Sequence, residues 1–263
     1  MLVLFHGLEG SSASHYAVDF ATHCMAQGAT CVVPHFRGCS GEINRAPRAY
    51  HSGDADEIEW ILRQVRAHLQ PQGPVWAVGV SLGGNALLRW AQEYGAHASP
   101  SVDRLVAICA PLDLTAAGRA IDSGLNRWLY ARMFLRTMKD KARRKWQQYP
   151  GLFDLDSAIS ADTIEAFDHA FTAPLHGFAS VTDYWTRASA QPRLASIRLP
   201  TLLLNPLNDP FVPAHSLPTP ADLSPSTTMW TPAAGGHVGF PVAHTARQSL
   251  TMVEAVWQWL STH

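Results

Sequence analysis

Long apolar runs are absent from this sequence of 263 residues. No uninterrupted stretch approaches the roughly 18 apolar residues that a membrane-spanning helix requires, so we expect no integral membrane segment. The first residues also lack the positively charged and apolar regions of a secretory signal peptide. Both absences lead us to expect a soluble, cytoplasmic protein.

Cysteine is scarce, and neither sign of charge dominates. The cysteines show no C-x-x-C spacing, so the sequence predicts reduced thiols rather than a disulfide framework or a zinc site: Cys24, Cys31, Cys39 and Cys109. The formal net charge of −1 gives no reason to expect nucleic acid or an acidic surface as a partner. With 47% hydrophobic and 16% charged residues, the chain suits one large α/β domain, or one domain carrying an insertion.

The stretch Pro74–Asn85 organises the rest of the chain. An apolar run from Val75 to Val80 leads into Gly-Val-Ser-Leu-Gly, and a helix-forming pattern follows. Strand, sharp corner and helix make the G-x-S-x-G nucleophile elbow, in which Ser81 takes a strained backbone conformation. The N–H groups at the start of the helix, beginning with Leu82, would face negative charge that develops during acyl transfer. A glycine-rich strand-to-helix turn without chemistry is the alternative for this pentapeptide.

A second motif follows the first expected strand, Met1–Phe5. His-Gly-Leu-Glu-Gly lets the backbone turn sharply and leaves the N–H of Leu8 facing the end of the neighbouring strand. In hydrolases with a serine elbow, this loop supplies half of the oxyanion hole. The donor would then be Leu8, paired with Leu82. The alternative is an ordinary turn in which His6 is a packing residue.

Strand and helix patterns alternate up to residue 111. Expected helices at 16–27 and 54–69 and expected strands at 29–34 and 102–110 surround the elbow, which predicts a doubly wound, mostly parallel sheet with helices on both faces. Arg37 and His51 lie in the connecting loops. They either touch substrate or, as is more usual for such residues, brace the loops.

The alternation stops between residues 112 and 191. Helical patterns at 126–135, 139–146, 163–168 and 178–189 predict a helical cap over the carboxyl edge of the sheet, where ligands bind in open α/β folds. Residues 1–111 and 192–263 would form the core, and the cap would shape an apolar pocket. The basic run Arg143–Lys145 is expected to be a solvated helix face.

The sheet resumes at Leu199–Asn205, and Asp209 lies just past this strand in a proline-framed loop. After a last expected strand, Thr227–Thr231, a Gly-Gly-His loop presents His237, and an amphipathic helix is expected at 242–260. The chain order Ser81, Asp209, His237 matches an α/β-hydrolase triad. A serine hydroxyl needs such a base, and the base needs a carboxylate that fixes its tautomer.

Six blocks in chain order carry a resemblance to a known family: His6–Gly10, Phe36–Gly41, Tyr50–Gly53, Gly79–Asn85, Asn208–Phe211 and Gly235–Phe240. They resemble the YheT-like branch of the α/β-hydrolases, in the AB-hydrolase 4 group. That branch includes bacterial proteins described as esterases, yeast medium-chain ester synthases and esterases, and mammalian lipid-hydrolysing relatives. The resemblance covers nearly the whole chain. It implies Ser81 as nucleophile, Asp209 as the triad acid and His237 as base, with Leu8 and Leu82 forming the oxyanion hole.

The sequence departs from this family at its front, because relatives carry two further strands before the His-Gly-Leu-Glu-Gly strand. The strand at 29–34 would then lie at an edge of the sheet with nothing beside it. An unpaired apolar edge favours aggregation or dimerisation, so a dimer through this edge is one expectation. A late start codon or a truncated gene would explain the shorter front.

These observations predict a serine hydrolase of the carboxylesterase type that cleaves small-molecule esters with an apolar acyl chain. The reaction needs no metal and no organic cofactor. Acyl transfer to an alcohol shares the same acyl-enzyme, so a medium-chain ester synthase is the first alternative. A non-catalytic α/β-hydrolase scaffold that binds a small lipid or a protein is the second.

Overall fold

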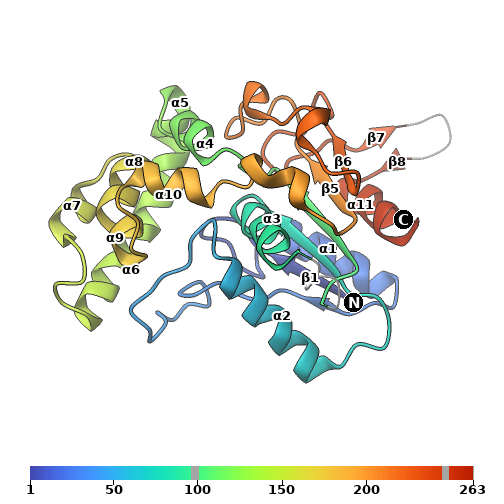
Figure 1. The fold of residues 1–263 in the computed structure, drawn as a ribbon, viewed down its shortest axis with the longest axis horizontal. Coiled ribbons are helices and arrows are strands. Elements are labelled where there is room, and N and C mark those ends of the chain that lie inside the picture. The colour runs from blue at the N-terminus through green and yellow to red at the C-terminus, as the bar shows by residue number, and fades with distance from the viewer. Residues whose placement is uncertain (96–100, 245–248, 263) are drawn as a thin grey trace.

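Six parallel strands form the central sheet of the computed structural model, which describes residues 1–95, 101–244 and 249–262 (Figure 1). The strand order is β2-β1-β3-β4-β5-β6, and the doubly wound parallel sheet predicted from the sequence is confirmed. The strands are β1 (Leu2–Phe5), β2 (Cys31–Val32), β3 (Trp76–Val80), β4 (Arg104–Ile108), β5 (Thr201–Leu204) and β6 (Thr227–Trp230).

Helices cover both faces of this sheet because its central strands are apolar on both sides. In β1, Val3 and Phe5 pack with α2 (Ala55–Leu69) and α3 (Leu82–Tyr94). The alternate residues Leu2 and Leu4 pack against the other face, with α1 (His15–Ala26) and α11 (Met252–Thr262). All four side chains of β1 are fully buried, so this strand lies at the centre of the core.

A helical segment connects β4 to β5 and lies to one side of the sheet (Figure 1). Within it the described residues form no strand, as the sequence predicted. Its elements are α4 (Leu114–Ile121), α5 (Gly124–Asn126), a π-helical turn (Arg127–Ala131), α6 (Arg132–Gln148), α7 (Leu155–Ser160), α8 (Ile164–Phe167), a second π-helical turn (Asp168–Thr172), α9 (Ala173–Leu175), α10 (Val181–Ala188) and a 3₁₀ turn (Gln191–Ser196). The segment has its own apolar cluster, which includes Leu135, Phe167 and Trp185. Its separation from the core as a cap of residues 112–191 stays a prediction.

The predicted start of the last helix is wrong. In place of a helix from residue 242, β7 (Ala243–His244) pairs with β8 (Ser249–Leu250) in an antiparallel ribbon, and α11 begins at Met252. Residues 245–248 of the expected helix lie outside the described residues. A capping box explains the later start: Glu254 N–H donates to Thr251 Oγ1 at 3.2 Å, and Thr251 N–H donates to Glu254 Oε2 at 2.7 Å.

Two further expectations are partly corrected. The strand expected at 29–34 does lie at the sheet edge, but β2 is only two residues long and pairs with β1 alone. The run Arg143–Lys145 is not wholly solvated, because Lys145 is buried and donates hydrogen bonds to the carbonyl oxygens of Asn44 and Ala46, both at 2.7 Å. Its long stem carries the charge from α6 to the loop that precedes α2. None of the described helices combines the length and apolar character needed to cross a bilayer.

Asn85, in the first turns of α3, ties the helical segment to the core. Its side chain is fully buried and donates to the Ser52 carbonyl at 2.8 Å, to Ser52 Oγ at 3.1 Å and to the Ala188 carbonyl at 2.8 Å. Its Oδ1 accepts from the Ala190 N–H at 3.0 Å. One amide therefore joins the helix after Ser81, the loop before α2 and the end of α10.

We expect Asn85→Ala to lower the free energy of unfolding by about 2–4 kcal/mol, because buried peptide groups at Ala188 and Ala190 lose their partner. Urea unfolding followed by circular dichroism measures the loss. Tyr94→Phe is the control on the same helix: its hydroxyl bonds Asp56 at an exposed place, so water can replace it at a cost below about 1 kcal/mol. Equal losses for the two variants would contradict the assignment.

Candidate active site

Ser81 stands at the corner between β3 and α3 with a left-handed backbone, φ 53° and ψ −122°. The chain segments around it approach too closely for side chains. A Cβ added to Gly79 would lie 2.6 Å from the Gly83 carbonyl oxygen, and one added to Gly83 would lie 2.5 Å from the carbonyl oxygens of Phe5 and His6. The observed backbone contacts therefore require glycine on both sides of the serine.

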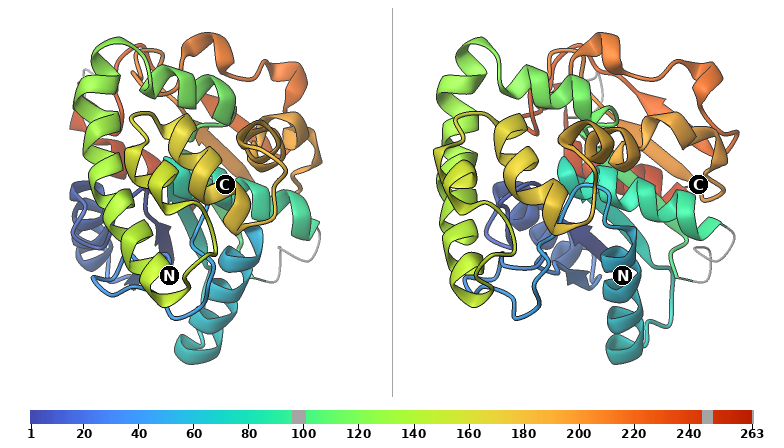
Figure 2. Two further views of the ribbon diagram at one scale, coloured as in Figure 1. Left: turned by 90° about the vertical axis from the view of Figure 1, so that its left-hand side faces the viewer. Right: turned by 60° about the vertical axis from the view of Figure 1, so that its left-hand side comes forward.

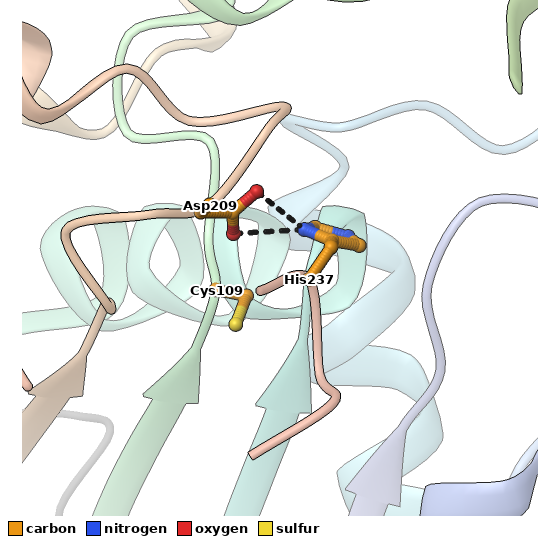
Figure 3. Close-up of side chains that lie close together, drawn as sticks. All are labelled: Cys109, Asp209 and His237. Atoms are coloured by element: carbon orange, nitrogen blue, oxygen red, sulfur yellow. Dashed lines mark hydrogen bonds and ion pairs between the residues drawn. The ribbon is translucent and has the colours of Figure 1, made fainter. Parts of the chain in front are cut away.

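The structure brings together the three residues predicted to form a triad. Ser81 follows β3, Asp209 follows β5 and His237 follows β6, all at the carboxyl edge of the sheet. His237 Nε2 lies 3.0 Å from Ser81 Oγ, and Nδ1 lies 2.9 Å and 3.1 Å from the two carboxylate oxygens of Asp209. Figure 3 shows the carboxylate facing the imidazole nitrogen. With Asp209 as acceptor, Nδ1 carries the proton and Nε2 is free to accept one from the serine.

Backbone contacts hold both loops of this pair in place. Asp209 Oδ1 also accepts from the N–H groups of Phe211 at 2.8 Å and Val212 at 3.3 Å, and the carboxylate is buried. Asn208 Oδ1 accepts from Gly235 and Gly236 N–H, both at 2.9 Å, which fastens the loop that carries His237. The sequence marks no role for Asn208, although it is the residue directly before the expected acid.

Leu8 and Leu82, the expected oxyanion donors, both line the pocket that contains Ser81. Across the described part of the chain, neither backbone N–H has a hydrogen-bond partner. The loop of Leu8 lies against the elbow, since a Cβ added to Gly7 would be 3.2 Å from Ser81 Cβ.

Three residues fix the shape of this loop through contacts that the sequence does not mark. Glu9 has a left-handed backbone with φ 57°, and its N–H donates to the Tyr50 hydroxyl oxygen at 2.9 Å. The Tyr50 hydroxyl donates in turn to Glu9 Oε1 at 2.8 Å. Lys141, on α6, donates to the same oxygen at 2.7 Å and is half-buried. An ion pair thus joins the helical segment to the loop of Leu8.

His6, Arg37 and His51 have bracing contacts. His6 is buried, its Nε2 accepts from Phe36 N–H at 3.1 Å, and burial lowers its pKa to about 4. Arg37 Nε lies 3.1 Å from Glu57, a carboxyl whose pKa is raised to about 7 by burial and by the neighbouring Asp54. His51 accepts from Gly53 N–H at 3.1 Å. Arg37 and His51 also line the pocket, so bracing and substrate contact are compatible.

The pocket beside Ser81 has an apolar part and a charged part. Side chains of the helical segment form the apolar part: Phe134, Met138, Ile164, Phe167, Phe171 and Trp185. Glu9, Arg37 and Lys141 line the charged part. Asp168 borders the apolar part, where it accepts hydrogen bonds from Thr172 and Trp185, and burial raises its pKa to about 6. An apolar space therefore lies next to Ser81, with charged side chains at its other side.

Cys109 lies beneath the His237–Asp209 pair, and the ligand atoms of all three lie within 4.8 Å of one another (Figure 3). This set is a poor fit for a metal ion. Burial, followed by the Asp209 charge, raises the pKa of the Cys109 thiol, which donates to the Gly236 carbonyl at 3.8 Å. A metal ligand must be a thiolate, and the facing atoms of Asp209 and His237 already bond each other.

Comparison with known proteins defines the class. Residues 1–243 match the family model described as alpha/beta hydrolase fold, and the chain belongs to this family. Two solved structures share the fold: a thermophilic esterase from Thermogutta terrifontis (TM-score 0.53, 17% identity, 99% of this chain and 89% of that chain) and Est1E from Butyrivibrio proteoclasticus (TM-score 0.55, 13% identity, 98% and 84%).

Within the family, the chain belongs to the YheT-like branch, as its motifs indicated. It is 38% identical to "Putative esterase YheT" of Escherichia coli over 100% of this chain and 76% of the relative. It is 30% identical to human phospholipase ABHD3, covering 95% of this chain but only 61% of the relative. A monoacylglycerol lipase of Saccharomyces cerevisiae is 23% identical over 91% of this chain and 54% of its own length. These similarities support a hydrolase.

The His51–His176 contact predicts a loss of stability in acid. The two rings are 4.5 Å apart, and burial is the main cause that lowers each pKa to about 3. Because an unfolded histidine titrates near 6.5, the unfolded chain binds more protons below that pH, and stability present above about pH 6.5 is lost as the pH falls toward 3. His176→Phe should reduce the loss between pH 7 and pH 5.5 by about 1 kcal/mol.

Urea unfolding of wild type and variant at both pH values measures this difference. His68→Gln, at an exposed position of α2, is the control and should follow the wild type. An unchanged pH dependence in His176→Phe would show that the pair is not held neutral.

Proposed function

We propose that this chain is a serine hydrolase of the carboxylesterase type, which cleaves carboxylic esters with an apolar acyl chain through an acyl-Ser81 intermediate. The observation that carries the proposal is the continuous hydrogen-bonded chain from Ser81 through His237 to Asp209, open to an apolar pocket. The relatives named esterase, phospholipase and monoacylglycerol lipase support ester cleavage as the reaction.

The geometry fits acylation and deacylation with one base. His237 Nε2 takes the proton of Ser81 Oγ as the oxygen attacks the ester carbonyl, and then gives it to the departing alkoxide. The same nitrogen next takes a proton from water as its oxygen attacks the acyl carbonyl. The bond between the acyl carbon and Ser81 Oγ then breaks, the acid leaves, and Nε2 returns the proton to Oγ. Asp209 holds the imidazole by Nδ1 and stabilises its cationic form. The backbone N–H groups of Phe211 and Val212 donate to Asp209 Oδ1 and hold the carboxylate in its orientation toward the ring.

In this proposal the N–H groups of Leu8 and Leu82 receive the oxyanion. Both are without partners in the described chain and both border the pocket at Ser81. Fixed dipoles of this kind stabilise charge that appears only in the transition state, which makes them a large contribution to rate.

The pocket supports an apolar acyl chain as the preferred group. Phe134, Phe167 and Phe171 come from three different parts of the helical segment and surround the space next to Ser81. Residues 112–191 would then act as a cap that keeps water from this space. The charged side chains Glu9 and Lys141 lie elsewhere in the pocket, on the side of the Leu8 loop.

Ser81→Ala is expected to abolish labelling by a fluorophosphonate probe and to lower kcat/KM for p-nitrophenyl acyl esters by at least about 10³-fold, since nothing else at the corner can form the acyl bond. Gel fluorescence and a spectrophotometric assay measure the two effects. Ser40→Ala, at an exposed position, is the control and should retain both. Folded wild-type protein that fails to label would refute the proposal and leave a binding scaffold.

Product analysis with ethanol added to the same assay separates hydrolysis from acyl transfer. A hydrolase releases mainly free acid, whereas an ester synthase forms ethyl ester in proportion to ethanol. Acyl chains from acetyl to decanoyl should show rising kcat/KM until the apolar part of the pocket is filled.

Tyr50→Phe should lower kcat by about tenfold and change KM by less than about twofold, because the Glu9 N–H loses its acceptor and the Leu8 N–H is held less firmly for the oxyanion. Steady-state kinetics give the two constants. Tyr94→Phe removes a hydroxyl that bonds Asp56 at an exposed place, and it should leave both constants unchanged. A change confined to KM would mean that Tyr50 contacts substrate instead.

A further inference from the structure

One continuous helix, from Gly124 through the π-helical turn to Gln148, carries apolar side chains that face solvent. Leu125 is 79% exposed, Trp128 61%, Leu129 63% and Met133 54%. Their spacing places them on one side of the helix. We call these four residues the outer apolar face. On the other described helices, large exposed apolar side chains occur at most in pairs: Val18 and Met25 on α1, and Trp60 and Leu69 on α2.

Basic side chains border this face in the π-helical turn and along α6. The exposed or half-exposed ones are Arg127, Arg132, Arg136, Lys139, Arg143 and Arg144. Asp162 pairs with Arg127 and Asp140 pairs with Arg143, while the remaining four make no ion pair within the described chain. In a chain with a formal net charge of −1, this concentration of positive charge is local.

A surface hollow lies where the apolar and basic parts meet. Trp128 and Leu135 line it together with Arg127, Arg132, Arg136 and Lys139, and Asp162 is the one acid among its lining residues. The Arg132 guanidinium sits 3.8 Å above the Trp128 ring, so part of its charge is held beside an apolar surface. Such a hollow suits an anionic headgroup whose apolar part lies against the tryptophan.

The opposite side of the same helix lines the pocket, through Phe134 and Met138. Tyr130 packs on Phe211 with ring centroids 4.6 Å apart, and Phe211 packs on His237 at 4.4 Å. Figure 2 shows this long helix at the outer edge of the molecule in both views. The exposed face and the pocket are thus two sides of one element.

We propose that the outer apolar face and its basic border dock on the surface of an anionic phospholipid bilayer. Leucine, methionine and tryptophan side chains would enter the boundary between headgroups and acyl chains, and the arginines would contact lipid phosphates. The charge favours this occupant over a second copy of the chain, because two such faces would repel each other. Docking is independent of the proposed function, since binding to a bilayer needs no chemistry at Ser81.

Vesicle flotation of the full chain tests the docking, with Ser81→Ala as the background so that no lipid is consumed. At 0.1 M salt we expect binding to vesicles of phosphatidylcholine with 30% phosphatidylglycerol to be at least about tenfold stronger than to phosphatidylcholine alone. Trp128→Glu with Leu129→Glu should weaken it by at least about tenfold. Trp60→Glu is the matched control, an equally exposed tryptophan on α2, and should bind as the parent does.

A second pair of variants tests the charge. Arg136→Gln with Lys139→Gln should weaken binding to anionic vesicles by at least about tenfold and reduce its salt dependence, whereas Arg63→Gln with Arg193→Gln, at exposed sites elsewhere, should not. Absence of binding to any vesicle would overturn the proposal, as would equal loss in Trp60→Glu. Size-exclusion chromatography detects the rival occupant: a dimer that Trp128→Glu dissociates, without vesicle binding, would identify a contact between copies and overturn docking.

Discussion

The strained backbone at Ser81 is the constraint on which the rest of the site depends. A residue with φ 53° between a strand and a helix persists only when neighbouring segments leave it no alternative. Here the corner is pressed between the Gly79–Gly83 contact on one side and the chain at Phe5 and His6 on the other. The same compression brings the Leu8 loop against the serine, so the proposed nucleophile and one proposed oxyanion donor are positioned by one set of backbone contacts.

Residues with a local signature were predictable. Glycines around Ser81, the proline-framed loop of Asp209 and the Gly-Gly-His loop each mark a turn after a strand, and parallel strands bring such turns to one edge. The parallel sheet was also predictable, because apolar strands and amphipathic helices alternate along the chain and each pattern is local. Thr251 and Glu254 carry the capping-box pattern at the observed start of α11, and the expectation of a helix from residue 242 did not use it.

Contacts between distant segments could not be predicted in this way. Tyr50 meets Glu9 across 41 positions, and Lys141 meets the same carboxylate across 132. Lys145 was expected in a solvated basic run, because nothing nearby in the sequence shows that its ammonium group donates to the carbonyls of Asn44 and Ala46. Pocket composition is likewise a tertiary property: Phe134 and Met138 belong to a helix whose outward positions are equally apolar.

The helical segment is attached to the core differently at its two sides, and Asn85 fixes one of them. The entry and exit of the helical segment are joined by the hydrogen bond from Gln191 N–H to the Leu112 carbonyl, and Asn85 binds the exit to the helix after Ser81. The two ends of the segment therefore cannot shift relative to α3 without breaking these buried hydrogen bonds. The opposite side is fastened by the ion pair of Lys141 and Glu9, whose side chains are 21% and 10% exposed, and by the hydrogen bonds from buried Lys145 to the carbonyls of Asn44 and Ala46. Movement of α6 away from the Leu8 loop would therefore break the contacts of two lysines, while the hydrogen bond between Gln191 and Leu112 and those of Asn85 could stay in place.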